Sequence, residues 1–452
     1  MARVHIVGAG LSGLAAAVRA AHRGIAVSLY EAAGRAGGRC RSFHDEILET
    51  RIDNGNHLLL SGNHSALEYL DMLGAGESLS GPISACFKFI DVTSHERWKI
   101  VLNDGPVPWW ILSPHRRVPG TSLADYRDIF KIISANSKHR VADVLSETSV
   151  LFSRFWEPLA LAALNTPIEI ASAELFKSVI KETFLKGGKY CRPLMVRKGL
   201  SESFVDPALE YLDRQRADVR FGYRLKDIEC GDYGLGGLIF NQGRIPVDVT
   251  NDYVILALPP LAMEALVPGV SPPLGAHAIV NVHYRLEEAR ASRNGVDFYG
   301  IINGVAHWVF LRGDIASVTV SAADDLAEKA SKEIAELVWP EVAAVLQLDV
   351  AMPSRYRVIK EKRATFSQTP EAVSKRAKTT TDYDNLFLAG DWTDTGLPAS
   401  IEGSIRSGFA AADLISSRLS TLPLRKKADK VILVAQPVRA TAPSTRFSGT
   451  EG

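Results

Sequence analysis

A glycine-rich turn near the N-terminus constrains the fold of this chain more than any other feature. A β-branched run over 4–7 leads into Gly8-Ala9-Gly10-Leu11-Ser12-Gly13, and an alanine-rich helix is predicted over 14–23. A second strand, predicted over 25–30, closes on Glu31. Strand, turn, helix and strand together form a complete βαβ unit of about 30 residues. The chain is therefore predicted to contain an α/β domain of the Rossmann type with a parallel sheet.

Each glycine of the turn has a physical role in binding a dinucleotide. Gly8 permits the tight turn, Gly10 lets the backbone approach a pyrophosphate, and Gly13 allows the helix to pack closely on the strand. The helix N-terminus offers free N–H groups to the phosphates. Glu31 follows Gly10 at the spacing of an acidic residue that accepts hydrogen bonds from a ribose. The residues predicted to surround the phosphates are Gly8, Gly10, Leu11, Ser12 and Gly13.

Composition excludes several other classes of protein. Among 452 residues, 52 Lys and Arg balance 51 Asp and Glu, so the net charge of +1 gives no overall attraction for nucleic acid. The four cysteines lie far apart without a C-x-x-C pair, which argues against a zinc site or a disulfide framework and favours a reducing cytosol. We expect no metal site and no membrane-spanning segment, because no run of about 18 apolar residues occurs.

The nucleotide-binding domain is predicted to be assembled from separated segments. Apolar runs at 253–258 and 386–388 are typical of buried parallel strands that end at a ligand crevice. Between them lie aromatic-rich and strand-like segments that indicate an inserted, mixed α+β substrate domain. The predicted ranges are 1–80, 190–260 and 384–420 for the nucleotide-binding domain, 81–189 and 261–383 for the substrate domain, and 421–452 for a disordered tail.

Four further motifs narrow the cofactor: Gly34-Arg35-Ala36-Gly37-Gly38-Arg39, Asp53-Asn54-Gly55-Asn56-His57, Ala389-Gly390-Asp391-Trp392 and the segment 396–404. Adjacent glycines expose backbone donors, and an arginine beside them can contact phosphate through two hydrogen bonds. Together with the N-terminal unit, these motifs resemble the FAD-binding amine oxidase and phytoene desaturase superfamily. The resemblance implies FAD as the cofactor. No cysteine lies in the C-terminal motifs, so we expect the FAD to be bound non-covalently.

The resemblance also implies which residues contact FAD. Beyond the first turn and Glu31, they are Gly37, Gly38, Arg39, Asn54, Gly55, Gly390, Asp391, Pro398, Ala399 and Ser400. Leu225, in the segment 220–225, is the nearest match to the residue whose backbone contacts adenine, although a plain β-strand explains that segment equally well.

Segments 53–60, 156–159 with 163–167, 308–310 and 360–366 are similar to one group within the superfamily, the hydroxysqualene dehydroxylases of hopanoid and triterpenoid biosynthesis. One departure is Asn56, where the group's pattern has glutamine. The resemblance implies that a long isoprenoid alcohol, hydroxysqualene, is reduced to squalene in an apolar tunnel. A carotenoid-type desaturase, a flavin amine oxidase and a non-enzymatic prenyl-binding escort protein remain as alternatives.

Three residues are candidates for the chemistry on the hydroxyl group. His57 is the first choice for a proton donor because an imidazole can be protonated near neutral pH, although a core histidine bonded to the backbone is an equal alternative. Asn165 and Thr166 can bind the hydroxyl group, or they can simply end a helix before Pro167.

An insoluble isoprenoid must be drawn from a membrane or from a neighbouring enzyme of the squalene pathway. Val107-Pro108-Trp109-Trp110-Ile111-Leu112, followed by His115-Arg116-Arg117, has the composition of a peripheral contact with the inner face of the cytoplasmic membrane. The alternative is a buried turn of the inserted domain.

Overall fold

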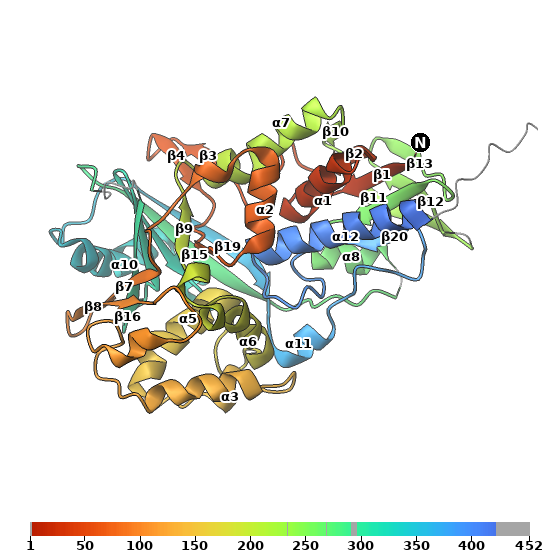
Figure 1. Cartoon of the computed structure of the whole chain (residues 1–452). Coiled ribbons are helices and arrows are strands. Elements are labelled where there is room, and N and C mark those ends of the chain that lie inside the picture. The colour runs from red at the N-terminus through yellow and green to blue at the C-terminus, as the bar shows by residue number, and fades with distance from the viewer. Residues whose placement is uncertain (1, 233, 268, 291–295, 422–452) are drawn as a thin grey trace, which may run out of the picture.

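The computed structural model describes residues 2–232, 234–267, 269–290 and 296–421. The predicted disordered tail, apart from residue 421 at the end of the last helix, lies outside the described residues. Figure 1 shows an elongated molecule, with a parallel sheet and its helices toward one end and a larger sheet at the other.

A five-stranded parallel sheet contains the predicted βαβ unit. Its strands, in the order in which they lie side by side, are β10 (Asp218–Phe221), β2 (Ala26–Glu31), β1 (Arg3–Val7), β14 (Asp252–Leu256) and β20 (Leu386–Leu388). All neighbouring strands are parallel. The apolar runs predicted at 253–258 and 386–388 thus join the N-terminal strands, which confirms that a Rossmann-type sheet is built from distant segments.

Two helices pack against each other beside this sheet (Figure 1). They are α1 (Leu11–His22) and α12 (Ile401–Thr421), the first and last helices of the described residues. Gly408 permits the close approach, because a Cβ atom at that position would lie 2.1 Å from the Ser12 carbonyl oxygen. Two further helices extend this layer: α2 (His64–Leu73) and α7 (Asp206–Arg214). Their apolar faces form one core with β1 and β2.

A seven-stranded sheet dominates the other end. Its spatial order is β19 (Tyr356–Phe366), β15 (Ala276–Arg285), β18 (Ile315–Val320), β17 (Trp308–Arg312), β16 (Val296–Ile302), β7 (Cys86–Asp91) and β8 (Arg97–Val101). Neighbours are antiparallel except β16 and β7. The helices α9 (Asp324–Glu328) and α10 (Ser331–Leu346) lie against it.

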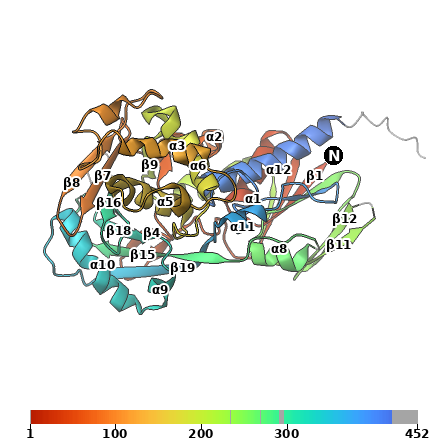
Figure 2. The same ribbon diagram turned by 90° about the horizontal axis from the view of Figure 1, so that it is seen from below.

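A helical layer lies beside the seven-stranded sheet (Figure 2). It contains α3 (Asp128–Ser134), α4 (Val141–Val144), a π-helical turn at Phe152–Trp156, α5 (Glu157–Leu164) and α6 (Ala173–Glu182). Its core is rich in buried aromatic side chains. The inserted part is therefore mixed α+β, as predicted. None of the helices in the described residues is long and apolar enough to cross a membrane.

Three small sheets and two further α-helices also belong to the described residues. They are β11 (Leu225–Gly231), β12 (Gly234–Phe240) and β13 (Gly243–Pro246), the hairpin of β3 (Ser42–Asp45) and β4 (Thr50–Asp53), the group of β5 (Leu59–Leu60), β9 (Pro193–Val196) and β6 (Leu79–Ser80), and the helices α8 (Pro260–Leu266) and α11 (Pro370–Ser374). The segment 220–225 is not one strand. Gly222, with φ of +76°, turns the chain between β10 and β11.

Candidate active site

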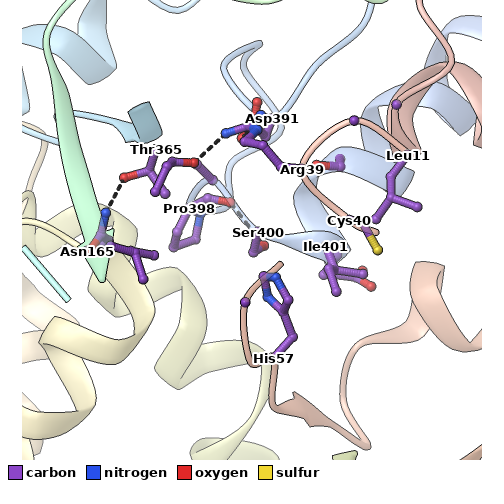
Figure 3. A pocket seen from close by; sticks show the side chains of 18 of the residues that line it. Leu11, Arg39, Cys40, His57, Asn165, Thr365, Asp391, Pro398, Ser400 and Ile401 are labelled. Carbon is purple, nitrogen blue, oxygen red and sulfur yellow. Dashed lines mark hydrogen bonds and ion pairs between the residues drawn. The ribbon is translucent and has the colours of Figure 1, made fainter. Parts of the chain in front are cut away.

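A single large cavity of about 840 Å³ connects the parallel sheet with the seven-stranded sheet and the helical layer. One end is lined by the glycine turn after β1 and by the loops after β2 and β20. The other end is lined by aromatic side chains, Phe87, Phe89, Phe155, Trp308 and Phe310. Figure 3 shows part of the lining from close by, with His57, Arg39 and Asp391 among the labelled residues. Such a volume accommodates a large organic ligand.

The glycine turn leaves open space where the dinucleotide motif requires it. Gly8 has φ of +101°, and a Cβ atom there would lie 2.4 Å from the Ala257 carbonyl oxygen. A Cβ atom at Gly13 would lie 1.8 Å from the Gly8 carbonyl oxygen. At Gly10, by contrast, a Cβ atom would meet nothing within 4 Å. Gly8 and Gly13 thus allow the turn itself, whereas Gly10 keeps the cavity wall free of a side chain.

The first turn of α1 is suited to an anion. Gly10 is its N-cap and provides no side chain to occupy the free N–H groups, and the first turn carries no acidic residue. Leu11 and Ser12 line the cavity at this point. Gly13 does not line the cavity, because it lies against the Gly8 carbonyl group. Its position matches the packing role predicted for the third glycine.

Glu31 lines the cavity and also holds the turn in place. Its Oε2 accepts a hydrogen bond from the Ala9 N–H at 2.7 Å, and its Oε1 accepts one from the Ala33 N–H at 2.8 Å. The carboxylate thus links the end of β2 to the glycine turn. Each carboxylate oxygen can accept a second hydrogen bond, so these contacts leave Glu31 able to bind a ribose hydroxyl group.

The second glycine pair packs against the first turn. The Gly37 N–H donates to the Ala9 carbonyl oxygen at 2.8 Å, and both Gly37 and Gly38 have positive φ. Both residues line the cavity. A Cβ atom at Gly38 would lie 3.4 Å from the Gly10 Cα atom, so the two glycine-rich segments lie close together. The pair therefore exposes backbone to the same end of the cavity as Gly10.

Arg39 is held by an acidic residue from the far end of the chain. Its Nη2 lies 2.8 Å from the Asp391 Oδ2. The negative charge of Asp391 is the main reason that the pKa of Arg39 is raised above its usual value, and burial opposes it. Both side chains line the cavity. The pair places one cation and one anion where a cofactor with phosphate and hydroxyl groups would be contacted.

The loop after β20 is fixed from behind by two buried polar side chains that the sequence motifs did not reveal. The Arg376 guanidinium donates to the carbonyl oxygens of Leu397, at 2.7 Å, and Asp391, at 3.1 Å. Burial lowers the pKa of Arg376 to about 10. The Gln368 Oε1 accepts a hydrogen bond from the Ala399 N–H at 2.9 Å. The predicted cofactor residues of this loop, Gly390, Asp391, Pro398, Ala399 and Ser400, all line the cavity.

The Asn54–Gly55 segment meets the seven-stranded sheet. Both residues line the cavity. A Cβ atom at Gly55 would lie 3.2 Å from the Asn281 Nδ2, so Asn281 would have to move by a few tenths of an ångström to admit a side chain here. Leu225 also lines the cavity, together with its neighbours Tyr223 and Arg224.

His57 lines the cavity, and Figure 3 shows its imidazole among the lining side chains. Within the part of the chain that the structure describes, the ring makes no hydrogen bond with another protein group. Burial lowers the pKa of His57, the positive charge of Arg39 adds to this effect, and the negative charge of Asp53 opposes it. The neutral ring is therefore favoured at pH 7, in contrast to the protonated form considered from the sequence.

Asn165 and Thr166 are already engaged by protein groups. Asn165 ends α5 in the left-handed conformation, its Nδ2 donates to the Thr365 Oγ1 at 3.0 Å, and its Oδ1 accepts from the Ala322 N–H at 2.7 Å. Asn165 lines the cavity, but Thr166 does not. The Thr166 hydroxyl donates to the Leu164 carbonyl oxygen and accepts from the Gln368 N–H. These contacts favour the helix-ending alternative.

A polar patch interrupts the aromatic end of the cavity. Its members are Asn56, His57, Asn281, Thr319 and Ser321. The Thr319 Oγ1 donates to the Asn281 Oδ1 at 2.8 Å, and the Asn56 Nδ2 donates to the Thr319 Oγ1 at 3.1 Å. The sequence motifs did not identify Asn281 or Thr319. The alternation of polar residues along 279–285 was a signal for Asn281, because every second residue of a strand faces the same side.

Comparison with known proteins decides the family. Residues 11–290 and 303–416 match the family described as "Flavin containing amine oxidoreductase". The chain belongs to this family. Flavin is accordingly the cofactor class of this site, and the chain is a flavin-dependent oxidoreductase.

Within the family, the chain resembles proteins named hydroxysqualene dehydroxylase. The one from Zymomonas mobilis is 40% identical over 92% of this chain and 100% of its own length. The one from Rhodopseudomonas palustris is 41% identical over 91% and 98%. The group resemblance predicted from the motifs is thereby confirmed.

A solved structure shares the fold. Cyclohexylamine oxidase from Brevibacterium oxydans superimposes with a TM-score of 0.69, at 16% identity, over 93% of this chain and 99% of that one. The fold class predicted from the sequence is confirmed.

Proposed function

We propose that this chain catalyses the FAD-dependent reduction of hydroxysqualene to squalene, in hopanoid or other triterpenoid biosynthesis. The proposal rests on its similarity to hydroxysqualene dehydroxylases over nearly their full length. The structural observation that supports the proposal most strongly is the large cavity, which runs from the glycine turn to the aromatic end that contains the polar patch. A long, apolar molecule with one hydroxyl group matches the aromatic end of this cavity.

The cofactor is proposed to be FAD, bound without a covalent bond. The cavity extends from the glycine turn and Glu31 to Asn54 and Gly55. The glycine turn and Glu31 thereby provide separate contacts for the adenosine half of FAD. The cavity-lining thiol, Cys40, is buried, and burial raises its pKa, so it stays protonated and unreactive. When bound and reduced, the flavin supplies a hydride.

The overall reaction determines what the chain itself must do. A C–O bond of the alcohol breaks, a C–H bond forms with the hydride, and the oxygen leaves as water after accepting one proton. The aromatic residues Phe87, Phe89 and Trp308 exclude bulk water, and their faces stabilise developing positive charge on carbon. Within the polar patch, Asn56, Asn281 and Thr319 provide polar atoms beside which the hydroxyl group would lie.

Anaerobic single turnover tests this proposal. The FAD-loaded protein is photoreduced and mixed with hydroxysqualene in detergent micelles, and the flavin spectrum and the extracted lipid are measured. We expect flavin reoxidation with one squalene formed per flavin. If hydroxysqualene leaves the flavin reduced while the oxidised protein accepts electrons from a polyene or an amine, the chain is a carotenoid-type desaturase or an amine oxidase instead. Protein that stays colourless with added FAD would indicate a non-enzymatic prenyl-binding role.

The two-domain division is likewise proposed, with residues 1–80, 190–260 and 384–420 in the FAD-binding domain and 81–189 and 261–383 in the substrate domain. All five strands of the parallel sheet fall in the first set, and all seven of the large sheet fall in the second, which supports it.

The substrate is proposed to come from the inner face of the cytoplasmic membrane or from a neighbouring enzyme of the squalene pathway. The segment 107–112 supports a membrane contact only in part. Trp109 is 64% exposed and Leu112 is also exposed, whereas Trp110 is only 7% exposed and packs edge-on against Tyr126. Val107, Trp109 and Leu112 are exposed and thus remain as the apolar contacts of this proposal.

A further inference from the structure

A second, much smaller pocket lies directly behind His57. It has a volume of about 30 Å³ and is lined by Asp53, Asn56, His57, Met195, Val196, Phe310, Arg312 and Ser317. His57, Asn56 and Phe310 line both this pocket and the large cavity. His57 therefore forms part of the wall between the two spaces.

The chemistry of the small pocket is that of a water site. Its volume is room for about two water molecules, and an ordered water is held by between two and four polar partners. Asp53, Arg312, Ser317, Asn56 and His57 supply polar atoms around it.

These polar groups are held in place by the protein. The Asp53 Oδ1 accepts from the Ser42 Oγ at 2.6 Å and from the Leu200 N–H at 2.9 Å. Its Oδ2 pairs with the Arg312 Nη1 at 2.9 Å. The pocket thus has rigid polar walls.

Ser317 connects the pocket to a second buried histidine. Its Oγ lies 2.7 Å from the His283 Nδ1, and both residues are buried. Arg312 keeps part of its side chain in contact with solvent, so the pocket lies beside a residue that reaches the surface. The pocket is therefore lined by groups that can accept a proton and by Arg312, which is in contact with solvent.

We propose that the small pocket holds water that passes a proton through His57 to the oxygen leaving the substrate. The inference rests on the proposed function, because the reductive removal of a hydroxyl group consumes one proton for each water released. His57 donates a proton from one ring nitrogen into the large cavity and receives one at the other from water in the pocket. The ring ends neutral, and the proton comes ultimately from solvent. Ser317 is a positioning residue that orients this water.

Kinetics on variants tests the relay. The reoxidation of photoreduced, FAD-loaded protein by hydroxysqualene is measured in H₂O and in D₂O. We expect His57→Gln to slow reoxidation by about 100-fold or more, the usual range for loss of a proton donor, and to abolish the difference between the solvents. Ser317→Ala should slow it by about tenfold and Ser317→Thr should restore it, because a hydroxyl group returns.

The matched controls are the variants His44→Gln and Ser134→Ala, at two exposed residues. Both variants should leave the rate of reoxidation unchanged. Reoxidation of the His57→Gln protein within twofold of the wild-type rate, with an unchanged solvent effect, would overturn the relay.

A structural readout does not depend on activity. Crystals of the FAD-loaded wild-type protein should show ordered water within hydrogen-bonding distance of both His57 and Ser317, and the water should be lost or displaced in Ser317→Ala. A dry pocket overturns the relay whatever the substrate is. By contrast, a water-filled pocket in a protein that leaves hydroxysqualene untouched overturns the proposed function and not the water site.

Discussion

The Arg39 guanidinium and the Asp391 carboxylate form an ion pair, with 2.8 Å between Nη2 and Oδ2, although one follows β2 and the other follows β20. These strands are separated in the sheet by β1 and β14, and all of them end at the same edge. The pair therefore spans the edge where parallel α/β sheets bind their ligands. Asp391 keeps the arginine in place at the cavity wall, so a cofactor meets a preorganised cation.

Replacing Arg39 should weaken FAD binding strongly. Arg39→Ala removes a charged hydrogen-bond donor and leaves the buried Asp391 carboxylate without its cation. Loss of such a contact is worth about 1.5–3 kcal/mol, so we expect the FAD dissociation constant to rise by about 10- to 100-fold.

Quenching of flavin fluorescence on titration of the protein measures the constant. Arg35→Ala, in the same loop but outside the cavity lining, is the matched control and should change it little. If both variants bind FAD equally well, Arg39 does not contact the cofactor.

The glycine turn and Glu31 could be predicted from the sequence because their determinants are local. The motif lies within one βαβ unit, and the positive φ at Gly8 is a property of that residue and its immediate neighbours. The apolar runs at β14 and β20 were also recognisable, because strands buried on both faces are apolar throughout.

The polar patch could not be predicted in the same way. Asn281 and Thr319 lie opposite each other only because β15 and β18 pair in one antiparallel register. Nothing in either segment alone specifies that register.

Arg376 could not be predicted from its sequence context either. It stands in the basic sequence Lys375-Arg376-Ala377-Lys378, which is typical of a protein surface, yet it is buried under the loop that lines the cavity.

Two glycines of the first turn should respond differently to the same substitution. Gly8→Ala places a side chain at a positive φ and against the Ala257 carbonyl oxygen, so we expect it to lower the free energy of unfolding by at least about 1–2 kcal/mol. Gly10→Ala meets open space, so stability should stay within about 0.5 kcal/mol. Its methyl group would occupy the cavity wall, and FAD affinity should fall by about tenfold or more.

Urea unfolding of the cofactor-free protein and FAD titration measure the two effects separately. Normal FAD binding by the Gly10→Ala protein would show that the pyrophosphate does not approach this glycine.

Stability should depend on pH through His283. Burial lowers the pKa of His283 from 6.5 to about 4, so between these values the unfolded chain binds more protons than the folded one. The contribution of His283 to the free energy of unfolding is therefore greatest above about pH 6.5. As the pH falls from 6.5 to 4, the free energy of unfolding decreases by about 3 kcal/mol because of this residue.

Urea unfolding at several pH values between 7.5 and 4.5 tests this dependence. His283→Gln keeps a polar group for the Ser317 hydroxyl but does not titrate, so its stability should fall less over this range than that of the wild-type protein. The matched control is the exposed His44, as His44→Gln. Equal losses of stability in the wild-type and His283→Gln proteins would show that His283 does not titrate in this way.

Membrane association should depend on Trp109 and not on Trp110. An exposed aromatic ring inserts at the interface of a bilayer, and its removal from the protein surface costs the fold little. The double variant Trp109→Ser, Leu112→Ser should therefore sediment less with liposomes that contain anionic lipid, with an unchanged flavin spectrum. Trp110→Ser is the contrasting variant, because loss of this buried ring should destabilise the fold by about 3 kcal/mol or more. Unchanged sedimentation of the double variant would place the membrane contact elsewhere.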